Sequence, residues 1–321
     1  MTTTPKTTLP EEFSTYTREI MGEQRWTRFA EAMGEEPPVS VRLNPMKFRS
    51  DSMALPAEED EPVEWCREGR YLKERPMFTL DPLLHAGAYY VQEAASMYIT
   101  QVIRDHAPAD RPLMVLDLCA APGGKSTAMR SVLPEGSLLM TNEPMRPRAN
   151  ILMENIQKFG HPDVIVTNNY AIDYQRSRLQ FDVILADVPC SGEGMFRKDE
   201  GAIREWSVAN VKKCAALQRE IITDIMPCLR DGGLLVYSTC TYNRQEDEEN
   251  VDFICSEWQM EKLSERHFIP GETRSEGLYM AALRQTGSDA SQQTTISMLD
   301  SSATKKDKKL KRRGKASAEQ A

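Results

Sequence analysis

Short apolar runs alternate with amphipathic helical segments from Pro112 onward, and this alternation constrains the fold of the chain more than any other feature. Strands that alternate with helices predict an α/β fold, a mostly parallel sheet with helices on both faces. Residues 147–159 and 208–229 are the clearest of the predicted helices, and Ile151, Leu152, Ile156 and Phe159 lie near one face of the first. The predicted strands are residues 113–118, 137–142, 164–167, 183–187, 234–238 and 278–283.

Residues 115–125 read Val-Leu-Asp-Leu-Cys-Ala-Ala-Pro-Gly-Gly-Lys, a predicted strand that enters a glycine turn and then a helix. Gly123 and Gly124 let the backbone turn tightly, and the start of the helix offers N–H groups to an anionic ligand. These features predict a site for a nucleotide-like cofactor, although a tight strand-to-helix connection would use the same glycines. Glu143 ends the next strand, where an acid binds ribose hydroxyls in α/β cofactor folds, or where a carboxylate is simply solvated.

Two cysteines each follow a predicted strand, Cys190 in Asp-Val-Pro-Cys and Cys240 in Ser-Thr-Cys-Thr. A thiolate is a strong nucleophile, so two thiols at strand ends beside a cofactor loop indicate a thiol-dependent group transfer. Alternatively, each cysteine is a small buried apolar residue, the most common environment of this side chain.

The cysteine pattern also bears on cellular location. The odd total of seven cysteines and the lack of a C-x-x-C pair predict neither a disulfide framework nor a metal site. A nucleophilic thiol needs a reducing compartment, and the chain has no membrane-length apolar run and no secretory signal at its start. We therefore expect a cytoplasmic protein that is not bound to a membrane.

The formal net charge of −8 argues against nucleic-acid binding unless basic residues are clustered. Acidic residues concentrate at 58–61 and 246–249, and both runs are predicted to be solvated surface. Basic residues concentrate at 305–315, with smaller clusters at 146–148 and 197–198, and RNA binding would have to use such patches.

Three stretches, LDLCAAPGGKST, DVPCSGEGMFRKD and LLVYSTCTYNRQEDEEN, resemble the RNA (cytosine-5) methyltransferases of the Nop/Sun/Fmu family. The resemblance runs from residue 9 to about residue 284, and the extended motif at 191–199 is most similar to the bacterial 16S ribosomal RNA enzymes. It implies a Rossmann-like fold and S-adenosylmethionine-dependent methylation of cytosine C5 in RNA, 16S ribosomal RNA foremost, through a covalent Cys–C6 adduct. The alternatives are a transfer RNA cytosine-5 methyltransferase, a non-catalytic RNA-binding ribosome-assembly factor, and a methyltransferase for a small molecule or protein, which the cysteine pair disfavours.

The resemblance also implies the cofactor site. Its loop comprises Cys119, Ala120, Ala121, Pro122, Gly123, Gly124 and Lys125, and Glu143 and Asp187 complete the pocket. After the third strand, where the family has an acid for the adenosine, this chain has Tyr170. Asn169, Tyr170 or Asp173 is therefore the candidate contact at this position.

For catalysis, the resemblance implies that Cys240 attacks cytosine C6. Asp187 would hold or donate a proton at N3, unless it only pairs with Lys125, the lysine that closes the glycine loop. Cys190 would assist loss of the C5 proton and release of Cys240. In DNA cytosine-5 methyltransferases the Pro-Cys cysteine attacks instead, so Cys190 is the alternative nucleophile.

The chain is expected to comprise an α+β N-terminal domain for RNA positioning (1–108), a methyltransferase domain (109–286) and a disordered basic tail (287–321). We expect a monomer, because no segment has a coiled-coil pattern. The hypothesis that the tail binds phosphate rests on its eight basic residues at 305–315. Candidate RNA contacts elsewhere are Arg42, Asn44, Lys47, Arg197 and Lys198, and Gln92 and Ser96 are candidate supports of the cofactor pocket.

Overall fold

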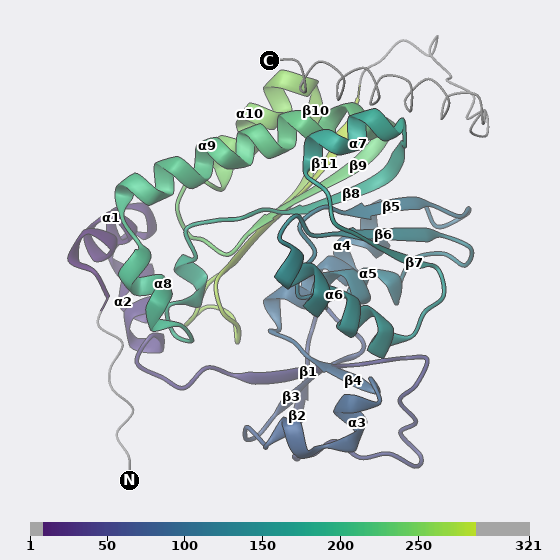
Figure 1. The fold of residues 1–321 in the computed structure, drawn as a ribbon. Helices are drawn as coiled ribbons and strands as arrows, with labels where there is room; N and C mark the ends of the chain where they lie inside the picture. The colour runs from purple at the N-terminus through teal and green to yellow at the C-terminus, as the bar shows by residue number, and fades with distance from the viewer. Residues whose placement is uncertain (1–8, 287–321) are drawn as a thin grey trace, which may run out of the picture. The chain divides into compact units, whose positions relative to one another are not determined.

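The predicted mostly parallel sheet is present in the computed structural model, which describes residues 9–286 and therefore not the predicted basic tail. Its seven strands have the order β10-β11-β9-β8-β5-β6-β7; the strands from β9 to β7 run parallel and the last two strands of the chain pair antiparallel at one edge (Figure 1). The strands are β5 (Met114–Asp117), β6 (Leu138–Asn142), β7 (Val164–Thr167), β8 (Phe181–Asp187), β9 (Leu229–Thr239), β10 (Met260–Phe268) and β11 (Leu278–Gln285). All six predicted strands are confirmed, whereas β10 was missed because its charged sequence shows no apolar run.

Helices cover both faces of this sheet, as predicted. One face packs against α4 (Ile99–His106) and α5 (Gly124–Arg130), and the other packs against α7 (Ala171–Ser177), α9 (Val208–Ile225) and α10 (Glu248–Trp258). Helix α6 (Arg146–Phe159) packs beside β7 through Leu152 and Ile156. The prediction that Ile151 shares this buried face is wrong, because its side chain is 50% exposed.

A smaller antiparallel sheet precedes the large one, with strand order β2-β3-β1-β4 (Figure 1). Its strands are β1 (Val39–Leu43), β2 (Glu59–Pro62), β3 (Gly69–Leu72) and β4 (Tyr89–Val91), and its short helices are η1 (Phe78–Leu80), α3 (Pro82–His85) and η2 (Ala95–Tyr98). Strand β2 carries the first acidic run and is exposed along its length, which confirms that run as solvated surface. The predicted domain boundary at residue 108 stays a prediction.

Three of the proposed RNA contacts hold the protein together. Arg42 is 1% exposed and donates to Gln92 Oε1 (2.8 Å) and Thr127 Oγ1 (2.6 Å), which ties β1 to α5. Asn44 Nδ2 donates to the carbonyls of Gly87 and Phe159, and Lys47 Nζ donates to that of Lys158. Donors at the last carbonyls of α6 cap that helix. Arg42 and Asn44 are thus buried in structural hydrogen bonds and are not on the open surface, and their predicted RNA role stays a prediction.

The N-terminal helices α1 (Glu11–Met21) and α2 (Glu23–Ala32) pack against the segment that follows β8. That segment contains η3 (Glu193–Met195) and α8 (Glu200–Glu205), and a further short helix, η4 (Met226–Cys228), follows α9. Phe13 forms edge-on contacts with Phe196 (4.9 Å between ring centroids) and Trp206 (5.5 Å). Arg197 is buried in a two-pronged ion pair with Glu276, with both contacts at 3.0 Å, so its predicted role on the RNA surface is wrong.

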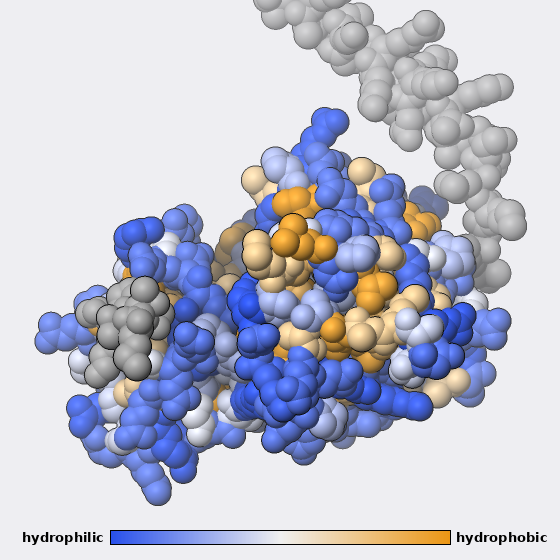
Figure 2. Space-filling model, turned by 90° about the horizontal axis from the view of Figure 1, so that it is seen from below, coloured by the Kyte–Doolittle hydropathy of each residue, from blue (hydrophilic) through white to orange (hydrophobic). Residues whose placement is uncertain are grey.

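On the face that Figure 2 shows, hydrophilic residues predominate, and the exposed hydrophobic residues gather over one part of it. None of the helices between residues 9 and 286 is long and apolar enough to cross a membrane.

Replacing Phe13 by alanine should lower the free energy of unfolding by about 3–5 kcal/mol, because the ring is fully buried among other aromatic side chains. Urea denaturation monitored by tryptophan fluorescence measures this change. Ile151→Ala, on the exposed face of α6, is the control, and its effect on the free energy of unfolding should stay within about 0.5 kcal/mol. Equal losses in both variants would contradict the packing described here.

Candidate active site

The glycine loop lies between β5 and α5 at the carboxyl ends of the parallel strands. Gly123 has a φ of +109°, a conformation that favours glycine, and a Cβ there would lie 3.1 Å from Leu152 Cδ1. The loop carbonyls are held from α6, because Ala121 O accepts from Arg148 Nη2 (3.0 Å) and Pro122 O accepts from Asn155 Nδ2 (2.8 Å). Side chains of α6 therefore fix the loop, and any residue other than glycine at position 123 would be strained.

Glu143 follows β6 directly and is 1% exposed. Its Oε1 accepts from the Met145 N–H (2.9 Å), and its Oε2 lies 3.5 Å from Arg148 Nη1. Within residues 9–286, Oε2 accepts no hydrogen bond, although it is buried. A buried carboxylate oxygen with spare acceptor capacity fits hydroxyl donors such as those of a ribose.

The three candidate cofactor contacts after β7 differ in the contacts that their side chains already make within the protein. Asp173 caps α7, because its Oδ2 accepts from the Tyr170 N–H (3.1 Å) and its Oδ1 lies 3.5 Å from Arg176. Asn169 is held through its backbone by Asn142, which leaves its side chain exposed beside the end of β6. The Tyr170 ring is 64% exposed. Asn169 and Tyr170 are thus the better placed of the three for a ligand.

The two cysteines meet at the ends of neighbouring strands. Strands β8 and β9 are parallel and in register at Asp187 and Ser238, so Cys190 and Cys240 follow them at the same sheet edge. Their sulfur atoms lie 3.0 Å apart, and the Cys240 N–H donates to Cys190 Sγ (3.4 Å). The hydrogen bond with Cys240, together with burial, raises the pKa of the Cys190 thiol well above its usual range. The Cys190 thiol therefore keeps its proton at neutral pH.

Lys125 and Asp187 form an ion pair next to these cysteines, with Nζ 2.8 Å from Oδ2. Burial opposes the charged form of Lys125, but the Asp187 carboxylate and its hydrogen bond outweigh burial, so the pKa of Lys125 is raised. The pairing of Asp187 with Lys125 is therefore present, and the predicted role of Asp187 at N3 stays a prediction. The pair places an ammonium group close to the glycine loop and the end of β8.

The second acidic run was predicted to be solvated surface, and this prediction is wrong for Glu246 and Asp247, which are fully buried. Glu246 accepts from the Ser191 N–H (3.0 Å), Gln218 Nε2 (2.7 Å) and Asn243 Nδ2 (2.8 Å). Neutral donors rather than cations thus satisfy this carboxylate, which explains why the charge pattern did not reveal its burial. Because Ser191 follows Cys190, Glu246 fixes the loop that carries the first thiol.

Two further buried acids were not singled out from the sequence, Asp117 in β5 and Glu193 in η3. Burial raises the pKa of each to about 7. Asp117 Oδ2 accepts from Ser126 Oγ (2.6 Å), and Glu193 accepts from Trp206 Nε1 (2.9 Å) and the Tyr242 N–H (2.7 Å). A carboxylate inside an apolar run, as at Asp117, is the signal that could have identified the first.

A family model described as 16S rRNA methyltransferase RsmB/F matches residues 106–284, more than half of the chain. The chain belongs to this family. A second family model, the N-terminal domain of 16S rRNA methyltransferase RsmF, matches residues 9–94.

Relatives named Ribosomal RNA small subunit methyltransferase F resemble the chain throughout. The protein from Pectobacterium atrosepticum is 33% identical over 310 residues, which cover 87% of this chain and 63% of the relative. The protein from Cronobacter sakazakii is 32% identical, and the match covers 87% of this chain and 64% of the relative. The chain therefore spans less than two thirds of the length of these relatives.

Two solved structures from Pyrococcus horikoshii share the fold. A methyltransferase homolog superimposes with a TM-score of 0.70 at 23% identity, covering 87% of this chain and all of its own. NSun6 with SFG superimposes with a TM-score of 0.75 at 18% identity, covering 87% of this chain and 99% of its own.

S-adenosylmethionine is the cofactor of this methyltransferase family, and the residues present fit it. The glycine loop lies beside the end of β6, because the Ala120 N–H donates to the Asn142 carbonyl (2.8 Å). Glu143 Oε2, one residue further on, is a buried acceptor without a hydrogen bond among the described residues. The loop from Cys119 to Lys125 and Glu143 therefore lie together at the carboxyl edge of the parallel strands.

Replacing Asp117 by asparagine should make stability less sensitive to pH. In the folded protein the pKa of Asp117 is raised from 3.8 to about 7, so ionisation destabilises the folded state as pH rises between these values. Asparagine cannot ionise, so the stability of the variant relative to wild type should increase by up to about 4 kcal/mol from pH 4 to pH 8. Urea unfolding of both proteins at each pH measures this difference. A difference that does not change with pH would show that the carboxyl group titrates normally.

Proposed function

We propose that the protein transfers a methyl group to C5 of a cytosine in RNA, with 16S ribosomal RNA as substrate. The observation that carries the proposal is the pair of thiols, 3.0 Å apart, at the ends of β8 and β9 beside the Lys125–Asp187 ion pair. Methylation at oxygen or nitrogen needs no thiol, whereas C5 of cytosine becomes a competent nucleophile only after a thiolate adds at C6. Ribosomal RNA as substrate is supported by the names of the relatives.

In this proposal Cys240 is the nucleophile and Cys190 is its partner. The raised pKa of Cys190 keeps that residue a thiol at neutral pH, and a thiol donor stabilises a thiolate at Cys240. The Cys240 sulfur bonds to C6 while N3 takes a proton from the Lys125–Asp187 pair. When bound, S-adenosylmethionine supplies an electrophilic methyl group for C5.

Release reverses the first step. Once the Cys240 sulfur is bonded to C6, the hydrogen bond that is the main cause of the raised pKa of Cys190 is lost. Cys190 then gives its proton to solvent, and its thiolate takes the proton from C5. The electrons of the C–H bond restore the ring double bond, Cys240 leaves as a thiolate, and N3 returns its proton to the Lys125–Asp187 pair. A base stacked inside a helix cannot reach side chains at a sheet edge, so the target cytosine would be unpaired or flipped. Reduced thiols and ribosomal RNA occur together in the cytoplasm, where we place the reaction.

Three alternatives to this proposal differ in the nucleophile, the activity or the substrate. If Cys190 attacks, as in the DNA enzymes, the raised pKa of its thiol would oppose the first step. If the protein only assists ribosome assembly, neither thiol would be needed. Transfer RNA is an alternative substrate of the same chemistry.

Labelled S-adenosylmethionine and RNA from a strain that lacks this gene should give labelled 5-methylcytosine in 16S RNA with the wild-type protein. Cys240→Ala should reduce the rate at least 10³-fold, because no thiolate can add at C6. Cys190→Ala should accumulate a covalent protein–RNA species that denaturing gels retain, because release is blocked.

Cys214→Ala, at a partly buried position of α9, is the matched control and should retain the wild-type rate. A covalent species with Cys240→Ala would reverse the two roles. No transfer to any RNA by a wild-type protein that still binds the cofactor would favour the assembly factor.

A further inference from the structure

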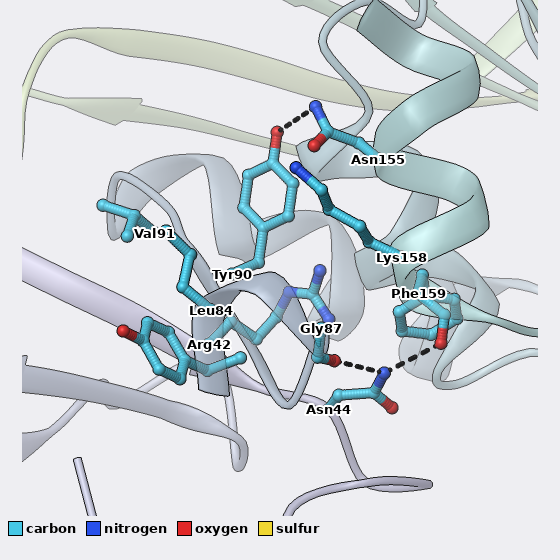
Figure 3. Close-up of a pocket in the computed structure, with 10 residues that line it drawn as sticks. Arg42, Asn44, Leu84, Gly87, Tyr90, Val91, Asn155, Lys158 and Phe159 are labelled. Carbon is cyan, nitrogen blue, oxygen red and sulfur yellow. Dashed lines mark hydrogen bonds between the residues drawn. The ribbon is translucent and has the colours of Figure 1, made fainter. Parts of the chain in front are cut away.

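A cavity of about 220 Å³ lies between the small sheet and α6, next to the glycine loop. Its polar lining consists of Arg42, Asn44, Tyr90, Asn155 and Lys158, and Figure 3 shows these side chains converging from β1, β4 and α6. None of its lining residues is among the predicted cofactor contacts or the two cysteines. The cavity is therefore a site separate from the one described above.

The charge of this cavity is positive. Arg42 is buried, and its guanidinium donates only to neutral groups: Gln92 Oε1, the Thr127 hydroxyl and carbonyl, and the Gly124 carbonyl. Burial lowers its pKa to about 10, which leaves it charged at neutral pH. Lys158 is exposed at the cavity, and its ammonium makes no hydrogen bond or ion pair with residues 9–286. No lining residue is an aspartate or glutamate.

A buried cation without a carboxylate partner is costly, and an anion in the cavity would offset that cost. Two cations without a counter-charge are unusual on a chain whose formal net charge is −8. The contacts of Arg42 with the Thr127 carbonyl (3.4 Å) and the Gly124 carbonyl (3.5 Å) are long, so this side chain retains donor capacity. These observations indicate that the ligand of this cavity is an anion.

The uncharged lining groups add a second requirement. Tyr90 presents an aromatic ring, and its hydroxyl lies 3.5 Å from the Asn155 amide, which also donates to the Pro122 carbonyl of the glycine loop. Aromatic rings stack on nucleobases, and amides bond to base edges. The volume is smaller than that of a typical pocket for a drug-sized molecule, so the cavity suits one unit of a longer ligand.

We propose that this cavity binds one nucleotide of the single-stranded RNA next to the target cytosine, with its phosphate on Arg42 and Lys158 and its base against Tyr90. The inference rests on the proposed RNA substrate and adds a recognition site outside the catalytic centre. Since Asn155 also holds the glycine loop, a bound nucleotide would contact a residue that shapes the cofactor site.

Fluorescence anisotropy with a labelled single-stranded RNA oligonucleotide at several salt concentrations tests the proposal. Lys158→Ala should weaken binding about three- to tenfold and lower the slope of log Kd against log salt by about one, as expected for one lost phosphate contact. Tyr90→Leu should weaken binding at least fivefold without a change in slope, because stacking carries no charge.

Lys212→Ala is the matched control, because Lys212 is exposed on α9 and outside the cavity. It should bind as wild type does. Wild-type affinity in both cavity variants, or an equal loss in Lys212→Ala, would overturn the proposal.

Methyl-transfer kinetics separate this failure from failure of the proposed function. If both proposals hold, Lys158→Ala raises KM for RNA and leaves kcat within twofold. If methyl transfer is normal and KM is unchanged, only the nucleotide site is wrong. If wild type transfers no methyl group but RNA binding still depends on Lys158 and Tyr90, the cavity binds RNA and the enzymatic proposal is wrong.

Discussion

The guanidinium of Arg42 is the interaction on which the arrangement of the two sheets depends. It extends from β1 of the small sheet to Thr127 and Gly124 of α5, the helix that begins at the glycine loop. Every acceptor that it uses is neutral, so no carboxylate competes for the position of the side chain. Asn44 and Lys47 continue the same connection to the last turn of α6. The segment from residue 42 to 47 therefore aligns both helices that flank the cofactor loop.

The catalytic arrangement follows from the direction of the strands. Because β8 and β9 are parallel neighbours in register, residues that follow them emerge at one edge, and two thiols 50 positions apart in the sequence come within 3.0 Å. Lys125 comes from the first turn of α5, and its ammonium reaches Asp187 at the end of β8. Strand β5, which precedes this helix, pairs with β8 on the side away from β9. Because the strand ends are fixed, few side-chain contacts are needed to hold the reacting groups in place. The main contact is that of Glu246, which accepts from the Ser191 N–H next to Cys190.

Much of the fold and the chemistry could be predicted from the sequence, because both are local patterns. The apolar runs identified six strands, and the cysteines, the glycine loop and Glu143 lie at strand ends as expected. The errors share a cause: charge suggests exposure, but Arg42, Arg197 and Glu246 are buried with partners that are remote in sequence. A local sequence pattern cannot identify a hydrogen-bond partner that lies far away in the sequence and comes close only through tertiary packing. Strand β10 was missed for a related reason, because at the sheet edge its stability comes from β11 rather than from its own apolar residues.

The packing of α1 against the segment after β8 also affects how the chain folds during synthesis. Phe13 emerges from the ribosome early, but its aromatic partners lie near residues 196 and 206, and Arg25 pairs with Glu272, 247 positions later. Contacts with such long sequence separation form late and slowly. The first helices must therefore wait, with their apolar faces exposed, until almost all of the described chain has been made. A chain that ends before Glu272 would therefore lack the carboxylate that pairs with Arg25 of α2.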